Sequence, residues 1–89
     1  MYRIPAPITM ANASASLDAL VRAIDGGESE VALDALAHSD SSAVAVLLVG
    51  LRRAHAAGRT IRFSAAPPSV RSLARLYGVD TLLGTPHAG

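Results

Sequence analysis

The sequence predicts a small α/β domain in which a short mixed β-sheet carries three to four helices, mainly on one face. Short apolar stretches typical of strands alternate with longer stretches whose apolar residues recur every three or four positions. Strands that alternate with helices imply crossover connections, which leave the helices packed on the sheet. With 51% hydrophobic residues, residues 1–89 are expected to form a single domain around one continuous core.

Residues 1–11 are expected to form one or two edge strands. Pro5 and Pro7 lack the backbone N–H that a strand inside a sheet donates, so this segment fits best at a sheet edge. Its inward-pointing apolar side chains are expected to be Ile4, Ile8 and Met10.

An amphipathic helix is predicted next. Ser14 or Ser16 is expected to cap its start, and the glycines at 26 and 27 are expected to end it. Its apolar residues follow the i, i+3, i+4, i+7 spacing of one helix face, namely Leu17, Leu20, Val21 and Ile24.

Residues 29–37 are predicted to form a buried central strand, because the segment is short, apolar and bounded by glycine-rich and polar turns. After a polar break at 38–42, a second helix is predicted to end at Gly58. Its core positions are expected to be Val44, Leu47, Leu48 and Leu51. On its opposite face, Val49 is an apolar residue without an obvious place in the core.

The third strand and helix are predicted from residues 59–64 and the segment that follows. Ile61 and Phe63 alternate with polar residues and share one strand face. The turn at 67–69 is expected to start a helix that Gly78 ends, with core positions Val70, Leu73, Ala74 and Tyr77. Residues 79–83 are expected to form a short apolar turn, and residues 84–89 a frayed tail.

Composition excludes several classes of function. Eight basic and seven acidic residues give a net charge of +1, too balanced for electrostatic binding of nucleic acid. The absence of cysteine excludes a disulfide scaffold, a thiol nucleophile and a cysteine-ligated metal.

No apolar signal segment opens the sequence, and its longest apolar run is about half of the ~20 residues a membrane span needs. We expect a cytoplasmic protein without direct membrane insertion.

The sequence contains no convincing catalytic, metal or cofactor motif. His38, His55 and His87 lack ligand spacing, so no metal is expected. Glycine-rich phosphate loops are also lacking, so no nucleotide cofactor is expected. Ser41 could be combined with His38 and Asp34 as a triad, but all three lie in one strand and its exit loop, from which they cannot readily converge. We expect a protein that is not an enzyme.

The informative motif is Asp40-Ser41-Ser42, at the junction between the buried strand and the second helix. Unpaired N–H groups and the helix dipole make such a position suitable for an anion or a phosphorylated side chain. The simpler interpretation is that Asp40 or Ser41 only caps the helix.

Several segments in register carry a resemblance to a known family. They are the strand at 31–36, the Asp40-Ser41-Ser42 junction, the strand at 61–63, the turn at 67–71 and the ending at 73–83, which contains Leu-Tyr-Gly-Val. Together they resemble the STAS domain, and within it the MlaB-like subunits of the bacterial phospholipid ABC transporter that maintains outer-membrane lipid asymmetry. The resemblance implies a small STAS-like fold and a subunit that binds and supports the transporter's cytoplasmic ATPase. It implies a location peripheral to the inner membrane through that partner.

The same resemblance places Ser41 at the family's phosphorylatable or partner-contact position. Ala43 stands where the family usually has glycine, and residues 12–14 replace an acidic loop, so we expect a contact residue instead of a phosphorylated one. The expected partner-binding residues extend along the outward face of the second helix and comprise Asp40, Ser41, Ser42, Ala45, Val49 and Arg52.

Two alternatives stay open. In the first, the chain is a phosphorylation-regulated anti-sigma factor antagonist that binds a serine-kinase anti-sigma factor through Ser41. The second concerns the arginines around the end of the second helix, which form either a solvated face that balances the helix dipole or a patch for a partner or lipid headgroup. These are Arg52, Arg53, Arg59 and Arg62.

Overall fold

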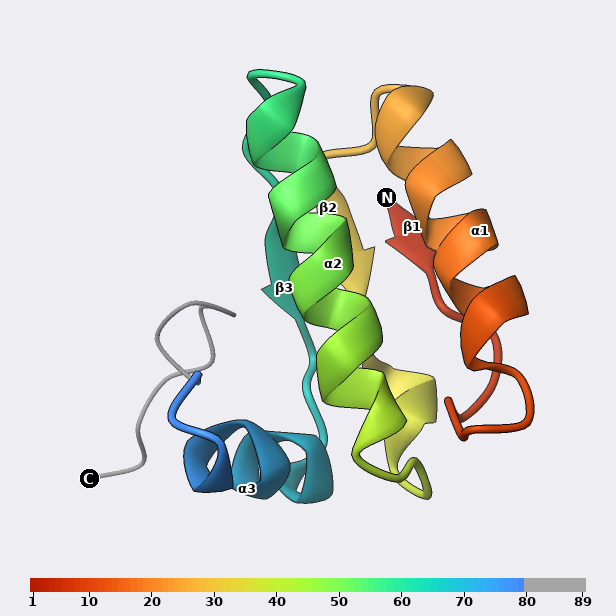
Figure 1. Ribbon diagram of the computed structural model, residues 1–89, viewed down its shortest axis with the longest axis vertical. Helices are drawn as coiled ribbons and strands as arrows, with labels where there is room; N and C mark the ends of the chain where they lie inside the picture. Colours follow the sequence, from red (N-terminus) through yellow and green to blue (C-terminus); the bar gives the residue numbers. More distant parts are fainter. Residues whose placement is uncertain (80–89) are drawn as a thin grey trace.

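A computed structural model describes residues 1–79 of the chain. Three α-helices accompany a three-stranded sheet in these residues. Along the chain the elements are β1 (Tyr2–Arg3), α1 (Ala13–Asp25), β2 (Glu30–Ala32), the 3-10 helix η1 (Asp34–Leu36), α2 (Ser42–Ala56), β3 (Arg62–Ser64) and α3 (Pro68–Leu76). Helices α1 and α2 lie side by side over one face of the sheet, and α3 lies across the end from which α2 starts (Figure 1).

The sheet has the order β1-β2-β3, and both pairs of strands are parallel. Residues 1–11 contribute a single edge strand, and α1 then crosses over to β2. A hairpin in this segment would have given the antiparallel pair of the expected mixed sheet. Because each strand within residues 1–79 is instead followed by a helix, this part of the sheet is parallel.

The core lies between the sheet and the pair α1 and α2. Val31 of β2 stands in register between Tyr2 and Phe63, on the face that the helices cover. As predicted, Ile4 and Ile8 are buried, but Met10 is wrong as a core residue because it is 84% exposed on the turn before α1. Aliphatic side chains of α1, of α2 and of the segment around η1 complete the core, including Leu20, Ile24, Leu33, Leu36 and Leu47.

The central strand is much shorter than the predicted segment 29–37. It ends at Ala32, and the backbone then turns through η1, where the Leu36 N–H donates to the Leu33 carbonyl. Leu33 and Leu36 are nevertheless fully buried. The apolar run therefore indicated burial correctly, but burial alone does not distinguish a strand from a tight helical turn.

Helix α3 ends earlier than its apolar spacing suggests. Val70 and Ala74 are buried as predicted, whereas Tyr77 follows the last helical residue and is 55% exposed. Gly78 takes a left-handed conformation (φ +69°), and the Val79 N–H then donates to the Ala74 carbonyl. The expected apolar turn and tail, apart from Val79, lie outside the described residues.

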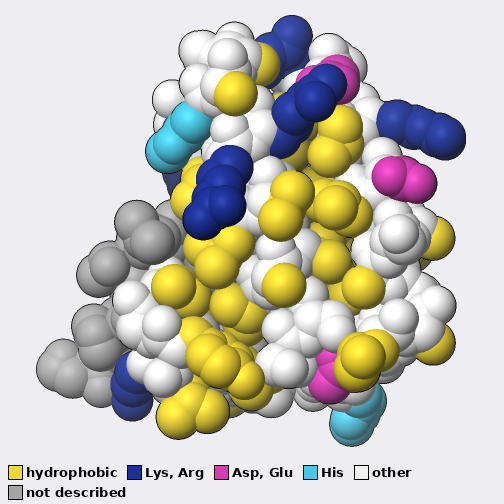
Figure 2. Space-filling view, in the orientation of Figure 1, with side chains coloured by type: hydrophobic (Ala, Val, Ile, Leu, Met, Phe, Trp, Pro, Cys, Tyr) yellow, Lys and Arg dark blue, Asp and Glu magenta, His cyan; other side chains and the backbone are white. Residues whose placement is uncertain are grey.

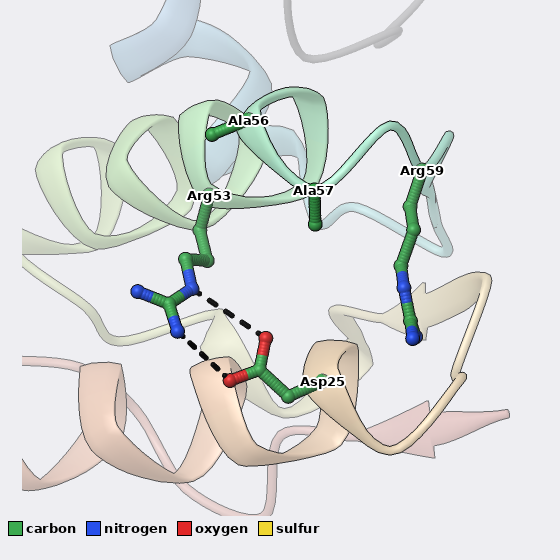
Figure 3. A pocket seen from close by; sticks show the side chains of 5 residues that line it. All are labelled: Asp25, Arg53, Ala56, Ala57 and Arg59. Carbon is green, nitrogen blue, oxygen red and sulfur yellow. Dashed lines mark hydrogen bonds and ion pairs between the residues drawn. The ribbon is translucent and has the colours of Figure 1, made fainter.

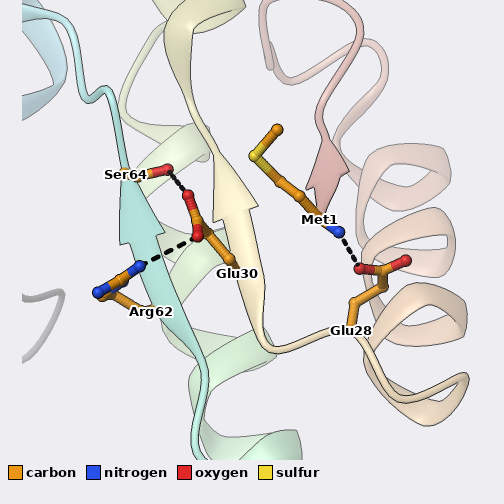
Figure 4. Close-up of polar contacts among 5 residues, drawn as sticks. All are labelled: Met1, Glu28, Glu30, Arg62 and Ser64. Atoms are coloured by element: carbon orange, nitrogen blue, oxygen red, sulfur yellow. Dashed lines mark hydrogen bonds and ion pairs between the residues drawn. The ribbon is translucent and has the colours of Figure 1, made fainter.

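The opposite face of the sheet carries polar side chains (Figure 4). Glu30 accepts hydrogen bonds from the Ser64 hydroxyl and the Arg62 guanidinium, each at 3.0 Å. These bonds, that of Ser64 foremost, lower the pKa of Glu30. Cross-strand pairs of this kind fix the register between β2 and β3.

The contact between α1 and α2 depends on Gly50, a buried residue in the middle of α2. A Cβ atom at this position would lie 2.5 Å from Leu20 Cδ2 and 3.2 Å from Leu20 Cγ. Leu20 is fully buried, so it has little room to move. The lack of a side chain at Gly50 thus permits the close approach of the two helices.

We predict that Gly50→Val destabilises the fold by about 1–3 kcal/mol, because it forces extra methyl groups into a filled contact. Urea denaturation followed by circular dichroism measures the loss. In a double-mutant cycle, Leu20→Ala should cost less free energy of unfolding in the Gly50→Val background than in the wild type. Equal costs in the two backgrounds would show that the two positions do not compete for space.

Candidate partner-binding site

The start of α2 is organised by the Asp40 side chain. Asp40 Oδ1 accepts a hydrogen bond from the Ser42 N–H at 2.8 Å, so Asp40 fulfils the expected capping role. The Ser41 side chain makes no capping hydrogen bond. The bond from the Ser42 backbone, with smaller contributions from the Ser42 hydroxyl and the Met10 N–H, lowers the pKa of Asp40.

The same carboxylate joins α2 to the N-terminal segment. Asp40 Oδ2 accepts from the Met10 N–H at 3.2 Å, and the Asp40 N–H donates to the Ile8 carbonyl at 3.1 Å. Next to it, Ser39 Oγ accepts from the Ile8 N–H at 2.8 Å. The chain before α1 is thus fixed against the chain before α2.

The predicted site residues on α2 share one outward face. Ser41, Ala45, Val49 and Arg52 are all exposed, and the exposed fraction of Val49 is 43%. Their spacing of four, four and three residues forms a single stripe along the helix. Ser42 is half-buried, and Asp40 is exposed with both carboxylate oxygens bonded to backbone N–H groups. Asp40 was predicted to contact a partner, and the structure shows that it also has a structural role.

A shallow groove opens beside Ser41, between α2 and the chain that leaves α3. It has a volume of about 360 Å³, and apolar surface dominates its lining. The residues along it are Ser41, Val44, Ala45, Leu48, Tyr77 and Val79. Tyr77, like Met10, was predicted to lie in the core but is exposed. Gly78 indicated where α3 ends, but the end of a helix does not determine whether the residue before the glycine is buried.

The four arginines around the end of α2 do not form one patch. Arg53 makes an ion pair with Asp25 of α1 at 3.1 Å (Figure 3). Arg59 donates to the Ile24 carbonyl at 2.6 Å, at the C-terminal end of α1. Arg62 pairs with Glu30 on the opposite face of the sheet. A groove of about 480 Å³ lies between Asp25, Arg53 and Arg59, but these side chains are already engaged with each other or with backbone.

The described residues do not assemble the alternative sites considered from the sequence. Asp34 forms an ion pair with Arg3 at 3.1 Å, and His38 is exposed after η1. Within residues 1–79, no group of three histidine or acidic side chains lies close enough to hold a metal ion. In the same residues, no helix has the length and apolar character required to cross a membrane.

We predict that Asp40→Asn lowers stability at about pH 7 and loses part of the acid sensitivity of the fold. A depressed pKa in the folded state stabilises above the unfolded pKa of about 3.9, and this contribution disappears as the pH falls through the folded value. The difference in free energy of unfolding between wild type and variant should therefore shrink towards about pH 3. Urea denaturation across this range measures it.

Glu30→Gln is the matched control, because the pKa of Glu30 is lowered independently of α2. The double variant should lose the sum of the two pH-dependent contributions. An Asp40→Asn profile parallel to that of the wild type at every pH would contradict the role of the ionised carboxylate.

Comparisons with known proteins now place this geometry in a family. The model of the family described as "Mlab, STAS domain" matches residues 5–84, which is most of the chain. A search of curated proteins finds no match. The matched segment contains every element from α1 to α3, including the exposed Ser41 and the groove beside it. The chain therefore belongs to the STAS domain family, in its MlaB-like branch.

Proposed function

We propose that this STAS domain is a non-enzymatic subunit that binds the cytoplasmic ATPase of a bacterial phospholipid-trafficking ABC transporter and supports its assembly and activity. Membership of the MlaB-like branch supports this proposal. The single observation that carries it is the exposed Ser41 at the tip of α2, beside an apolar groove. The domain would be held at the inner membrane through this partner.

The surface has the features of a docking contact. Ser41 and Ala45 are small, so a partner's backbone can approach α2 closely. Val49 and Tyr77 offer exposed apolar side chains, and tyrosine is among the residue types that most often contribute strongly to binding when buried in an interface. Arg52, at the far end of the stripe, is available for a carboxylate at the rim.

Chemistry at Ser41 has less support. A serine nucleophile requires a base within hydrogen-bonding reach and donors for the developing oxyanion. Asp34, the acid considered from the sequence, is occupied by Arg3. Ser41 as a contact residue needs none of these groups.

An anti-sigma factor antagonist is the second candidate. The exposure of Ser41 favours it, because a kinase requires an accessible hydroxyl. A phosphate there would add about −1.5 to −2 charges close to the Asp40 carboxylate. Both candidates use the same surface, so the identity of the partner separates them.

Affinity capture of the tagged chain from detergent-solubilised membranes of the source organism, followed by mass spectrometry, is the decisive experiment. Recovery of an ABC-type ATPase together with its permease supports the transporter subunit. A soluble kinase-like anti-sigma factor in their place would support the second candidate and contradict the first.

We predict that Ser41→Arg weakens binding to the captured ATPase by about tenfold or more without unfolding the domain, because the bulky cation prevents close approach to α2. Isothermal titration calorimetry measures the affinity, and thermal denaturation checks the fold. The matched control is Ser72→Arg, at an exposed position of α3. Unchanged affinity for Ser41→Arg would remove Ser41 from the interface.

A further inference from the structure

The turn before α1 is held by its own hydrogen bonds as well as by Asp40. The Thr9 N–H donates to Asn12 Oδ1 at 2.9 Å, and Asn12 Nδ2 donates to the Pro7 carbonyl at 2.9 Å. The Asn12 N–H in turn donates to the Thr9 carbonyl at 3.1 Å. Residues 7–12 therefore form a closed turn, and we name this segment the Met10 turn.

Met10 occupies the tip of this turn and contributes nothing to the core. Its exposed fraction is 84%, above the 66% of Met1 and the 75% of Leu76. A flexible thioether side chain is costly to expose but adapts well to an apolar partner surface. The backbone that carries it is fixed, so little backbone entropy would be lost on binding.

The Met10 turn lies next to the proposed docking surface. The Met10 N–H donates to a carboxylate oxygen of Asp40 at 3.2 Å, and Asp40 directly precedes Ser41. On another side of Ser41 is the groove with Tyr77 and Val79. Figure 2 shows hydrophobic side chains across the middle and lower parts of the helix-bearing face, while most of its arginines lie in the upper part.

The charges on this face indicate the chemistry of the partner. Asp40 is already bonded to two backbone N–H groups, so it does not require a cation from a partner. Arg53, on the same helix as Ser41, already pairs with Asp25 of α1. Of the residues that the structure describes, none places a carboxylate within ion-pairing distance of Arg52. Arg52 lies eleven positions after Ser41, which is about 16 Å along the helix axis.

We propose that the Met10 turn and the groove beside Ser41 are two apolar anchors of one docking surface. This surface fits a protein partner that presents an apolar patch to Met10 and Tyr77 and a carboxylate to Arg52. The inference rests on the proposed function, since it describes the surface by which the ATPase is bound. Asp40 is a positioning residue in this arrangement, because its carboxylate holds the Met10 turn beside α2.

The test measures the affinity of the purified chain for the ATPase identified by capture, using isothermal titration calorimetry. We expect Met10→Ser to weaken binding about tenfold and Met10→Leu, which keeps an apolar side chain, to change it less than about threefold. Ala15→Ser, at an exposed position of α1 outside this turn, is the matched control and should bind as the wild type. Arg52→Glu should weaken binding and reverse its salt dependence.

Hydrogen exchange and binding affinity together test the positioning role of Asp40. Asp40→Ala should accelerate hydrogen exchange at the Met10 amide and weaken binding. Adding Met10→Ser to Asp40→Ala should then cost less affinity than Met10→Ser costs alone. Fully additive losses would overturn this role.

The outcomes separate the inference from the proposed function. If Ser41→Arg and Tyr77→Ala weaken binding while Met10→Ser and Arg52→Glu do not, the docking surface described here is wrong but the transporter subunit stands. If capture recovers no ABC-type ATPase, the proposed function fails and the inference fails with it.

Discussion

The Asp40 carboxylate is the interaction on which the candidate site depends. One oxygen caps α2 and the other holds the turn before α1, so a single side chain fixes two segments that are 30 residues apart. Ser41, directly after Asp40, is thereby presented at a defined position instead of on a free loop. The two backbone bonds to the charged form also explain why the pKa of this exposed carboxyl is low.

Small residues give the helical layer its shape. With only 3% aromatic residues, the core is filled by aliphatic side chains, and α1 and α2 approach closely where α2 has Gly50. Ala43 and Ala54 are fully buried on the same helix. Because only one face of α2 takes part in this packing, the opposite face does not contribute to the core, and Val49 is exposed there.

Helix periodicity allowed much of the fold to be predicted, whereas the expected cap of α1 at Ser14 or Ser16 was wrong because the helix begins at Ala13, directly after Asn12. The spacing in α2 identified its exposed stripe from Ser41 to Arg52, and the sequence left the cap open between Asp40 and Ser41, of which Asp40 makes the bond. The partners of Arg53 and Arg59 could not be predicted, because Asp25 and the Ile24 carbonyl are brought to them only by the packing of α1 on α2. The groove depends in the same way on where α3 ends. Met10 was assigned to the core from hydrophobicity alone, which does not reveal that a hydrogen-bonded turn holds it in solvent.

The attachment of the N-terminal segment also protects the sheet. Strand β1 is only two residues long, and the Ile4 N–H donates to the Ala32 carbonyl just beyond it. Further along, the segment is secured at Ser39 and Asp40. Release of that anchorage would let β1 detach, leaving the backbone of β2 open to pairing with other chains. Asp40, which presents the docking surface, therefore also helps to keep β1 paired along the edge of β2.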